Sequence, residues 1–162
     1  MAIVVNLFTY SFADQKTPLS CRLLNESNGL SDNRVTDLFK DRSGYMWIGT
    51  ANGLNRYDGQ NFVQYHPREL VKRLSNEFIT GIGQDERGDL WVSTKNGLNQ
   101  LFLDKDSVSI FLPKPNQSPH DPTSLSNSLL WDLFVQGSKV WLAIDNRDLC
   151  YYDIRNKVFR YF

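Results

Sequence analysis

The chain has 162 residues, and its 18 basic and 18 acidic side chains give a formal net charge of zero. This balance disfavours a nucleic-acid-binding domain, because such domains usually carry a basic patch. Hydrophobic residues make up 41% of the chain and aromatic residues 13%, which is enough for a packed core and too much for a disordered chain. No run of about 18 apolar residues occurs, so no transmembrane helix is predicted within the chain.

The N-terminal residues 1–13 are uncharged and mostly apolar. Ser11 and Ala13 are small residues at the −3 and −1 positions of a cut before Asp14, as a secretory signal requires. The basic start of such a signal is missing, so we interpret residues 1–13 as the remnant of a signal peptide. An edge strand or an irregular start is the alternative. Residues 14–162 then form the folded part.

The folded part begins with a single expected outer strand at residues 17–24, followed by a four-strand unit at residues 32–65. The strands of this unit are expected at 35–40, 46–50, 54–57 and 62–65. Polar residues and glycines separate them, as is typical of tight turns. The Asn52-Gly53 pair predicts a type I′ hairpin turn between the second and third strands.

The same order of strands recurs over residues 75–111 and 126–162. The second unit is expected to have strands at 78–84, 90–94, 98–102 and 108–111. The third is expected to have them at 129–135, 140–144, 149–152 and 158–161. Trp47 and Trp91 lie 44 residues apart, and Gly53 and Gly97 keep the same offset. Trp141 takes the tryptophan position of the third unit, whose turn residues differ.

Four-strand units that repeat every 40–45 residues or so are typical of β-propeller blades. We therefore predict an all-β fold, with about three blades of an incomplete propeller, each a four-stranded antiparallel meander. Trp47, Trp91 and Trp141 are expected to pack between blades rather than to stack on a ligand. Propellers usually have about 4–8 blades. An arc of three leaves two apolar faces uncovered, and these should bind the rest of a propeller or make the isolated chain self-associate.

Two of the units closely resemble the two-component regulator propeller repeat. The resemblance rests on Gly29-Leu30-Ser31-Asp32-Asn33-Arg34-Val35, on Asp41-x-x-Gly44-x-x-Trp47-Ile48-Gly49-Thr50 with Asn52-Gly53-Leu54-Asn55, and on Asp85-x-x-Gly88-x-x-Trp91-Val92-Ser93-Thr94 with Asn96-Gly97-Leu98-Asn99. Ser93 replaces the glycine that is usual in the repeat. Less closely, the resemblance extends over residues 17–162.

The resemblance implies the periplasmic sensor region of a hybrid two-component system. In such proteins a membrane helix, a histidine kinase and a DNA-binding module follow the propellers, and carbohydrate fragments commonly switch on gene expression. Within this chain it implies ligand sensing without catalysis, with no nucleic-acid contact and no membrane contact except through a downstream helix. The alternatives are a carbohydrate-acting propeller enzyme, such as a lyase, and a protein-interaction scaffold.

No catalytic, metal-binding or cofactor-binding motif is present, and His66 and His120 are the only histidines. A ligand is most simply placed where the inter-blade connections and the second turn of each blade emerge on one face. The candidate ligand-binding residues there are Asn52, Lys95, Asn96, Asp145 and Asn146, with Trp131 contributing from the channel side. An oligosaccharide would use their polar groups and the indole ring. The alternative is that the asparagines serve only the turn backbone, as Gly53 and Gly97 do.

Cys21 and Cys150 are the only cysteines. Isolated cysteines in strands are more often small packing residues than a disulfide, so we expect two free thiols. The disulfide remains the alternative, and the spacing excludes a metal knuckle.

Overall fold

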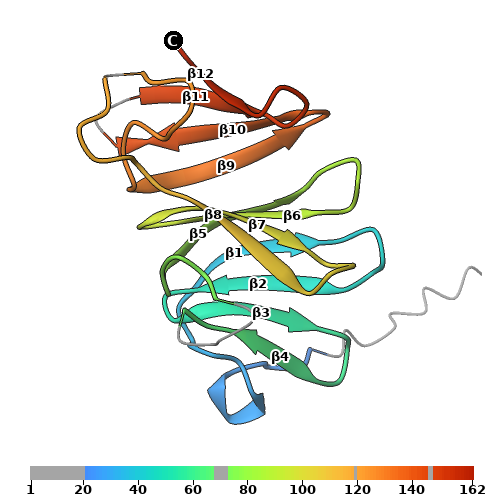
Figure 1. Cartoon of the computed structure of the whole chain (residues 1–162). Helices are drawn as coiled ribbons and strands as arrows, with labels where there is room; N and C mark the ends of the chain where they lie inside the picture. The colour runs from blue at the N-terminus through green and yellow to red at the C-terminus, as the bar shows by residue number, and fades with distance from the viewer. Residues whose placement is uncertain (1–20, 68–72, 119, 146–147) are drawn as a thin grey trace, which may run out of the picture.

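The computed structural model describes residues 21–67, 73–118, 120–145 and 148–162 (Figure 1). These residues form three four-stranded antiparallel sheets, in each of which consecutive strands are neighbours. Figure 1 shows the sheets following one another along the molecule as separate layers. The all-β fold built from propeller blades is therefore confirmed.

The strands follow the order expected from the repeat. The first blade consists of β1 (Val35–Lys40), β2 (Met46–Thr50), β3 (Gly53–Tyr57) and β4 (Phe62–Tyr65). The second consists of β5 (Ile79–Gln84), β6 (Leu90–Thr94), β7 (Gly97–Phe102) and β8 (Ser107–Phe111). The third consists of β9 (Leu130–Gln136), β10 (Lys139–Ile144), β11 (Asp148–Asp153) and β12 (Val158–Tyr161). No bound differs by more than one residue from its predicted position.

The segment before the first blade differs from the expected outer strand. Residues 21–24 are irregular, and a short 3-10 helix, η1 (Glu26–Asn28), follows them. The amide of Gln64 in β4 donates to the Gly29 carbonyl at 2.9 Å, which ties this segment to the first blade. The rest of the expected strand, residues 17–20, and the proposed signal remnant, residues 1–13, lie outside the described residues.

An aspartate and a tryptophan six residues later shape the first turn of two blades. Asp41 accepts the Tyr45 backbone N–H through Oδ1 and the Trp47 indole N–H through Oδ2, the latter at 2.8 Å. In the second blade Asp85 accepts the Trp91 indole N–H at 2.9 Å. One buried carboxylate thus satisfies both a turn amide and an indole, which explains the Asp-x5-Trp spacing.

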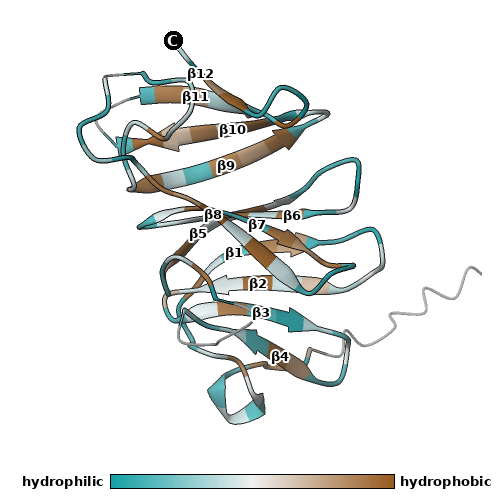
Figure 2. Cartoon of the chain, in the orientation of Figure 1, coloured by the Kyte–Doolittle hydropathy of each residue, from teal (hydrophilic) through white to brown (hydrophobic). Residues whose placement is uncertain are grey.

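Trp47 and Trp91 lie in the contacts between blades. Both are fully buried. Trp47 packs in a cluster with Ile79 and Ile82 of the second blade, and the Trp91 ring centroid lies 5.5 Å from that of Tyr152 in the third. Figure 2 shows hydrophobic residues along the strands and hydrophilic ones in many of the turns. The expected packing role is thus seen for these two tryptophans, whereas Trp141 is only half-buried.

The innermost strand of each blade carries one extra residue near its start. The register shifts between Val35 and Asp37 in β1, between Ile79 and Gly81 in β5, and opposite Ala143 and Ile144 for β9. The residues left without a direct partner are Thr36, Thr80 and Trp131. Such a bulge re-aims a side chain, and in β9 the re-aimed side chain is the large indole of Trp131.

The predicted type I′ turn at Asn52-Gly53 is wrong. Thr50 pairs with Gly53, so the turn residues are Ala51 and Asn52, and neither has a positive φ. Gly53 itself has a φ of 117° and donates its N–H to the Glu77 carbonyl of the next connection at 2.7 Å. The glycine is therefore required one position later, where the chain turns toward the neighbouring blade.

Both cysteines are free thiols. Cys150 is buried in β11, as expected of a packing residue, whereas the same expectation is wrong for Cys21, which is exposed and lies in an irregular segment. Within the described residues, no helix has the length and apolar character that crossing a membrane would require.

Candidate ligand-binding face

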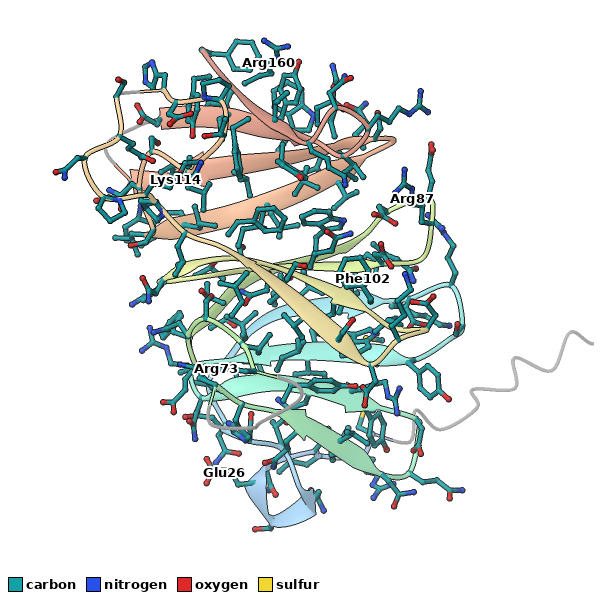
Figure 3. All side chains as sticks on the ribbon, in the orientation of Figure 1. Glu26, Arg73, Arg87, Phe102, Lys114 and Arg160 are labelled. Carbon is teal, nitrogen blue, oxygen red and sulfur yellow. The ribbon has the colours of Figure 1, made fainter. Side chains whose placement is uncertain are left out.

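The connections between blades and the second turn of each blade lie on one side of the molecule, which we call the connection face. In Figure 3, Arg73 and Lys114 mark the two connections on this side, whereas Arg87, in the first turn of the second blade, lies on the opposite side. Backbone bonds link each second turn to the segment that precedes an inner strand. Lys95 N–H donates to the Phe78 carbonyl, and Asp145 N–H donates to that of Leu129.

Trp131 and Asp145 form a pair on this face. The Trp131 side chain is 56% exposed, and its indole N–H donates to Asp145 Oδ1 at 3.2 Å. The bond fixes the ring at the start of the inner strand and leaves most of it open to solvent. An exposed, oriented indole of this kind suits stacking against the apolar face of a sugar ring.

A second cluster lies between the first and second blades, and of its members the sequence pointed to Lys95 but not to Phe78 or Arg34. Lys95 Nζ lies 3.9 Å from the Phe78 ring centroid, and the Arg34 guanidinium carbon lies 5.2 Å from it. Cations over an aromatic face are held by the ring quadrupole. Arg34 and Phe78 both directly precede an inner strand, and this shared place in the repeat is the signal that could have identified them.

Backbone groups in and beside the second turns bond to threonine hydroxyls and, in the first blade, to the Asn52 side chain. Asn52 and Asn96 each donate a backbone N–H, to Thr50 Oγ1 and to Thr94 Oγ1 respectively, at 3.1 Å in both cases. The Asn52 side-chain amide also reaches the Ser31 carbonyl at 3.4 Å. Both side chains are exposed. Asn146 lies outside the described residues.

The connection face carries charged side chains of both signs. Asp121, in the connection to the third blade, accepts hydrogen bonds from the backbone N–H and the hydroxyl of Thr123, which hold the pKa of its carboxyl below the ordinary value. With Asp145, Lys95 and Arg34, the face offers carboxylates, an ammonium and a guanidinium. These groups can donate to and accept from the hydroxyls of a neutral or weakly charged ligand.

Other hollows lie away from this face. One of about 470 Å³ is formed by the first turns of the first two blades together with the β7–β8 turn, and charged side chains such as Arg42, Glu86 and Lys105 line it. Another of about 310 Å³ lies between the second and third blades, next to Phe111 and Tyr152. Among the described residues, no group of three or more His, Cys, Asp or Glu side chains is placed to hold a metal ion.

Two segments of the chain match a known family of repeats. Residues 29–52 and 73–96 match the two component regulator propeller family. Two segments of the chain therefore each match a two-component regulator propeller repeat. Each matched segment contains the Asp-x5-Trp pair and ends in the second turn of its blade. The repeats therefore supply both the tryptophans between the blades and the turns of the connection face.

Solved structures share the arrangement of blades. The extracellular domain of the hybrid two component system BT3049 from B. thetaiotaomicron superimposes with a TM-score of 0.78 and 26% identity over 87% of this chain. The extracellular domain of BT4673 from the same organism gives a TM-score of 0.68 with 22% identity over 85% of this chain, a likeness of fold. This chain spans about a fifth of each: 20% of the former and 19% of the latter.

A curated protein matches over a shorter stretch. Histidine kinase P4 of Formosa agariphila is 32% identical over 63 residues, which are 39% of this chain and 5% of that protein. The chain is therefore similar to a small part of a much longer sequence.

Proposed function

We propose that this chain is a segment of an extracytoplasmic, ligand-sensing propeller of a hybrid two-component sensor. The regulator propeller repeats and the likeness to extracellular domains of such systems support the proposal. The similarity to a histidine kinase supports it further. In the proposed parent protein, the segment lies in the periplasm, and kinase and DNA-binding modules outside it change gene expression. The segment itself is proposed to bind ligand without turning it over.

Carbohydrate fragments are the ligands that the connection face favours. The observation that carries this is the exposed Trp131 ring, whose orientation is set by its bond to Asp145. Lys95 and Arg34, held against Phe78, provide donors on the neighbouring blades. An aromatic platform beside fixed donors and acceptors is the combination that sugar rings require.

The test is a titration of the chain with neutral and acidic oligosaccharides. Tryptophan-to-phenylalanine variants would assign the indole N–H resonances. We expect the Trp131 signal to move on binding while the signals of the buried Trp47 and Trp91 stay in place. Trp131→Ala should lower the affinity at least tenfold, whereas Trp131→Phe should lose less because a ring remains.

Two outcomes would contradict the proposal. Uniform affinity across Trp131→Ala, Lys95→Ala and the unchanged chain would remove the connection face as the ligand site. Release of shortened or unsaturated sugar products would instead favour the enzyme alternative.

A further inference from the structure

The third blade exposes the side that its neighbours bury. We call the side of each sheet that carries Trp47, Trp91 or Trp141 the tryptophan side. In the first two blades it packs against the next blade. In the third blade it forms a hollow of about 150 Å³ lined by Asp132, Leu133, Phe134, Trp141, Ala143 and Leu149. Phe134 and Leu149 are exposed there, so this side is an apolar surface without a cover among the described residues.

One polar position recurs within this surface. Strand register makes Asp37, Gly81 and Asp132 equivalent, because they pair with Gly49, Ser93 and Ala143 at the same place in their sheets. The residues that follow them, Leu38, Ile82 and Leu133, are equivalent for the same reason. At this position of the inner strand, the first blade therefore has aspartate, the second has glycine and the third has aspartate.

At the contact between the first and second blades, the aspartate serves both inner strands. Asp37 Oδ1 accepts the N–H of Leu38 at 2.8 Å, and its Oδ2 accepts the N–H of Ile82 in the next blade at 2.7 Å. Gly81, just before Ile82, has no side chain to compete for that N–H. A charge-assisted bond therefore joins the two blades.

At the contact between the second and third blades, the order of aspartate and glycine is reversed. A Cβ atom added to Gly81 would lie 2.8 Å from Asp132 Oδ1 and 2.9 Å from the Leu133 nitrogen. Asp132 Oδ1 accepts the Leu133 N–H at 2.7 Å in the space that the glycine leaves free. Each contact thus pairs one aspartate with one glycine.

We propose that the tryptophan side of the third blade binds a further propeller blade that has glycine at the position of Gly81. Asp132 Oδ2, for which the described residues provide no hydrogen bond, then accepts the N–H of the residue after that glycine, as Asp37 does for Ile82. The apolar residue after the glycine covers Trp141 and Phe134. This interface continues the two that the chain already contains.

A second copy of this chain is a poorer occupant. Its first blade offers Leu38, which is 61% exposed, whereas the equivalent Ile82 and Leu133 are 7% and 9% exposed. However, Asp37 precedes Leu38 and already binds its N–H. Asp132 would then face a second carboxylate instead of a free N–H, and two like charges in a closing interface repel each other.

The test extends the full chain by a copy of residues 66–111 placed directly after Phe162. Tyr65 pairs with Leu54 in the first blade, and Phe111 pairs with Leu98 in the second. Phe162 donates its N–H to Leu149, which is equivalent to Leu54 and Leu98, so Phe162 ends the third blade as Tyr65 ends the first. A copy that starts at residue 66 therefore follows Phe162 with the same spacing as in the chain itself. Hydrogen exchange in β10 (Lys139–Ile144) reports docking. We expect it to slow at least tenfold relative to the 162-residue chain. Gly81→Asp in the appended copy alone, or Asp132→Ala, should lose most of this protection. Exchange in β2, which lies outside the duplicated residues, serves as the folding control.

Equal protection with glycine or aspartate in the appended copy would overturn the proposal. So would a dimer of the 162-residue chain, in sedimentation velocity, that Leu38→Lys and Trp141→Lys each abolish. That result would show that a second copy occupies the surface.

Discussion

Asp41 and Asp85 each hold a turn and a tryptophan at the same time. Asp85 is 2% exposed and accepts the backbone N–H groups of Arg87 and Asp89 in addition to the Trp91 indole N–H. A buried donor left without an acceptor costs roughly 1–3 kcal/mol. The third blade has a shorter first turn, at Gly137 and Ser138, and no aspartate in this position. The tryptophan side is therefore held most firmly where the aspartate is present.

Replacing Asp85 should destabilise the chain much more than replacing its neighbour Asp89. Asp85→Ala leaves three donors without an acceptor, so we expect it to lower the free energy of unfolding by roughly 3 kcal/mol. Within the part of the chain that the structure describes, the Asp89 carboxyl accepts one hydrogen bond, from the Gln100 side-chain amide, and burial is the main cause that raises its pKa. Asp89→Ala should therefore cost far less than Asp85→Ala. Urea unfolding followed by fluorescence measures both. Similar losses for the two variants would refute the role of Asp85.

The two thiols should differ sharply in reactivity. Burial, and then the charge of Asp148, raise the pKa of Cys150 from 9.0 to about 12. Since the thiolate is the reactive form, a thiol reagent at pH 8 should label Cys21 in the native chain and Cys150 only after unfolding. Above pH 9 the unfolded chain loses this proton before the folded chain does. Stability should therefore fall as the pH rises from 9 toward 12, and Cys150→Ala should remove that part of the fall.

The Cys21→Ser variant keeps Cys150 as its single thiol. Fast labelling of that variant in its native state would contradict the buried position of Cys150.

At the scale of elements, the second turns join neighbouring blades through their glycines. Gly97 has a φ of 112° and donates its N–H to the Ser128 carbonyl of the next connection at 2.7 Å, as Gly53 does to Glu77. A Cβ atom at Gly97 would lie 2.6 Å from Leu112 Cδ2 and 2.8 Å from the Phe111 carbonyl oxygen. This glycine is needed both for its backbone angle and for the close approach of two segments.

Gly97→Ala should therefore cost more than Gly88→Ala, although both residues have a positive φ. At Gly88, which has a φ of 94°, an added Cβ would meet only the Gln84 side chain at 3.9 Å, so the loss there is limited to backbone strain of about 1 kcal/mol. At Gly97 the overlap should add roughly 1–3 kcal/mol. Thermal unfolding of the two variants gives the comparison, and equal shifts in Tm would mean that the approach is not tight.

The strands could be predicted from the sequence because turn residues and tryptophans recur at one spacing. The turn type could not, since Asn52-Gly53 is compatible both with a type I′ turn and with a glycine placed just after the turn. The glycine lies just after the turn because its N–H donates to the Glu77 carbonyl in the next connection, a contact that forms only in the fold. The candidate site shows the same limit. Trp131 and Lys95 were identified as exposed groups, but the Asp145 bond and the Phe78 contact depend on segments that meet only in the fold.

At the scale of the molecule, the repeated tryptophan is fully buried in the first two blades and half-buried in the third. Trp47 and Trp91 are fully buried because a further blade covers each of them. Trp141 occupies the equivalent position, and among the described residues its aromatic partners are Tyr151 and Phe162, both of the third blade. The Phe162 ring centroid lies 5.7 Å away, and Phe162 is itself 75% exposed. The contacts between blades therefore supply most of the apolar burial of these residues.

Truncation of the two tryptophans should separate the contribution of the blade contact from that of the blade itself. Trp91→Ala removes a fully buried ring from between two sheets, so we expect a loss of about 3–5 kcal/mol in the free energy of unfolding. Trp141→Ala removes a half-buried ring from an open surface and should cost roughly 1 kcal/mol or less. Because Trp91→Ala could prevent folding, Trp91→Phe provides the milder comparison, with Trp141→Phe as its match. Equal losses for the matched pair would show that the tryptophans stabilise their own sheets rather than the contacts between blades. The same variants can be measured in the chain extended by a copy of residues 66–111. If the loss in unfolding free energy for Trp141→Phe rises there toward that for Trp91→Phe, the difference between the two arises from the missing cover over Trp141.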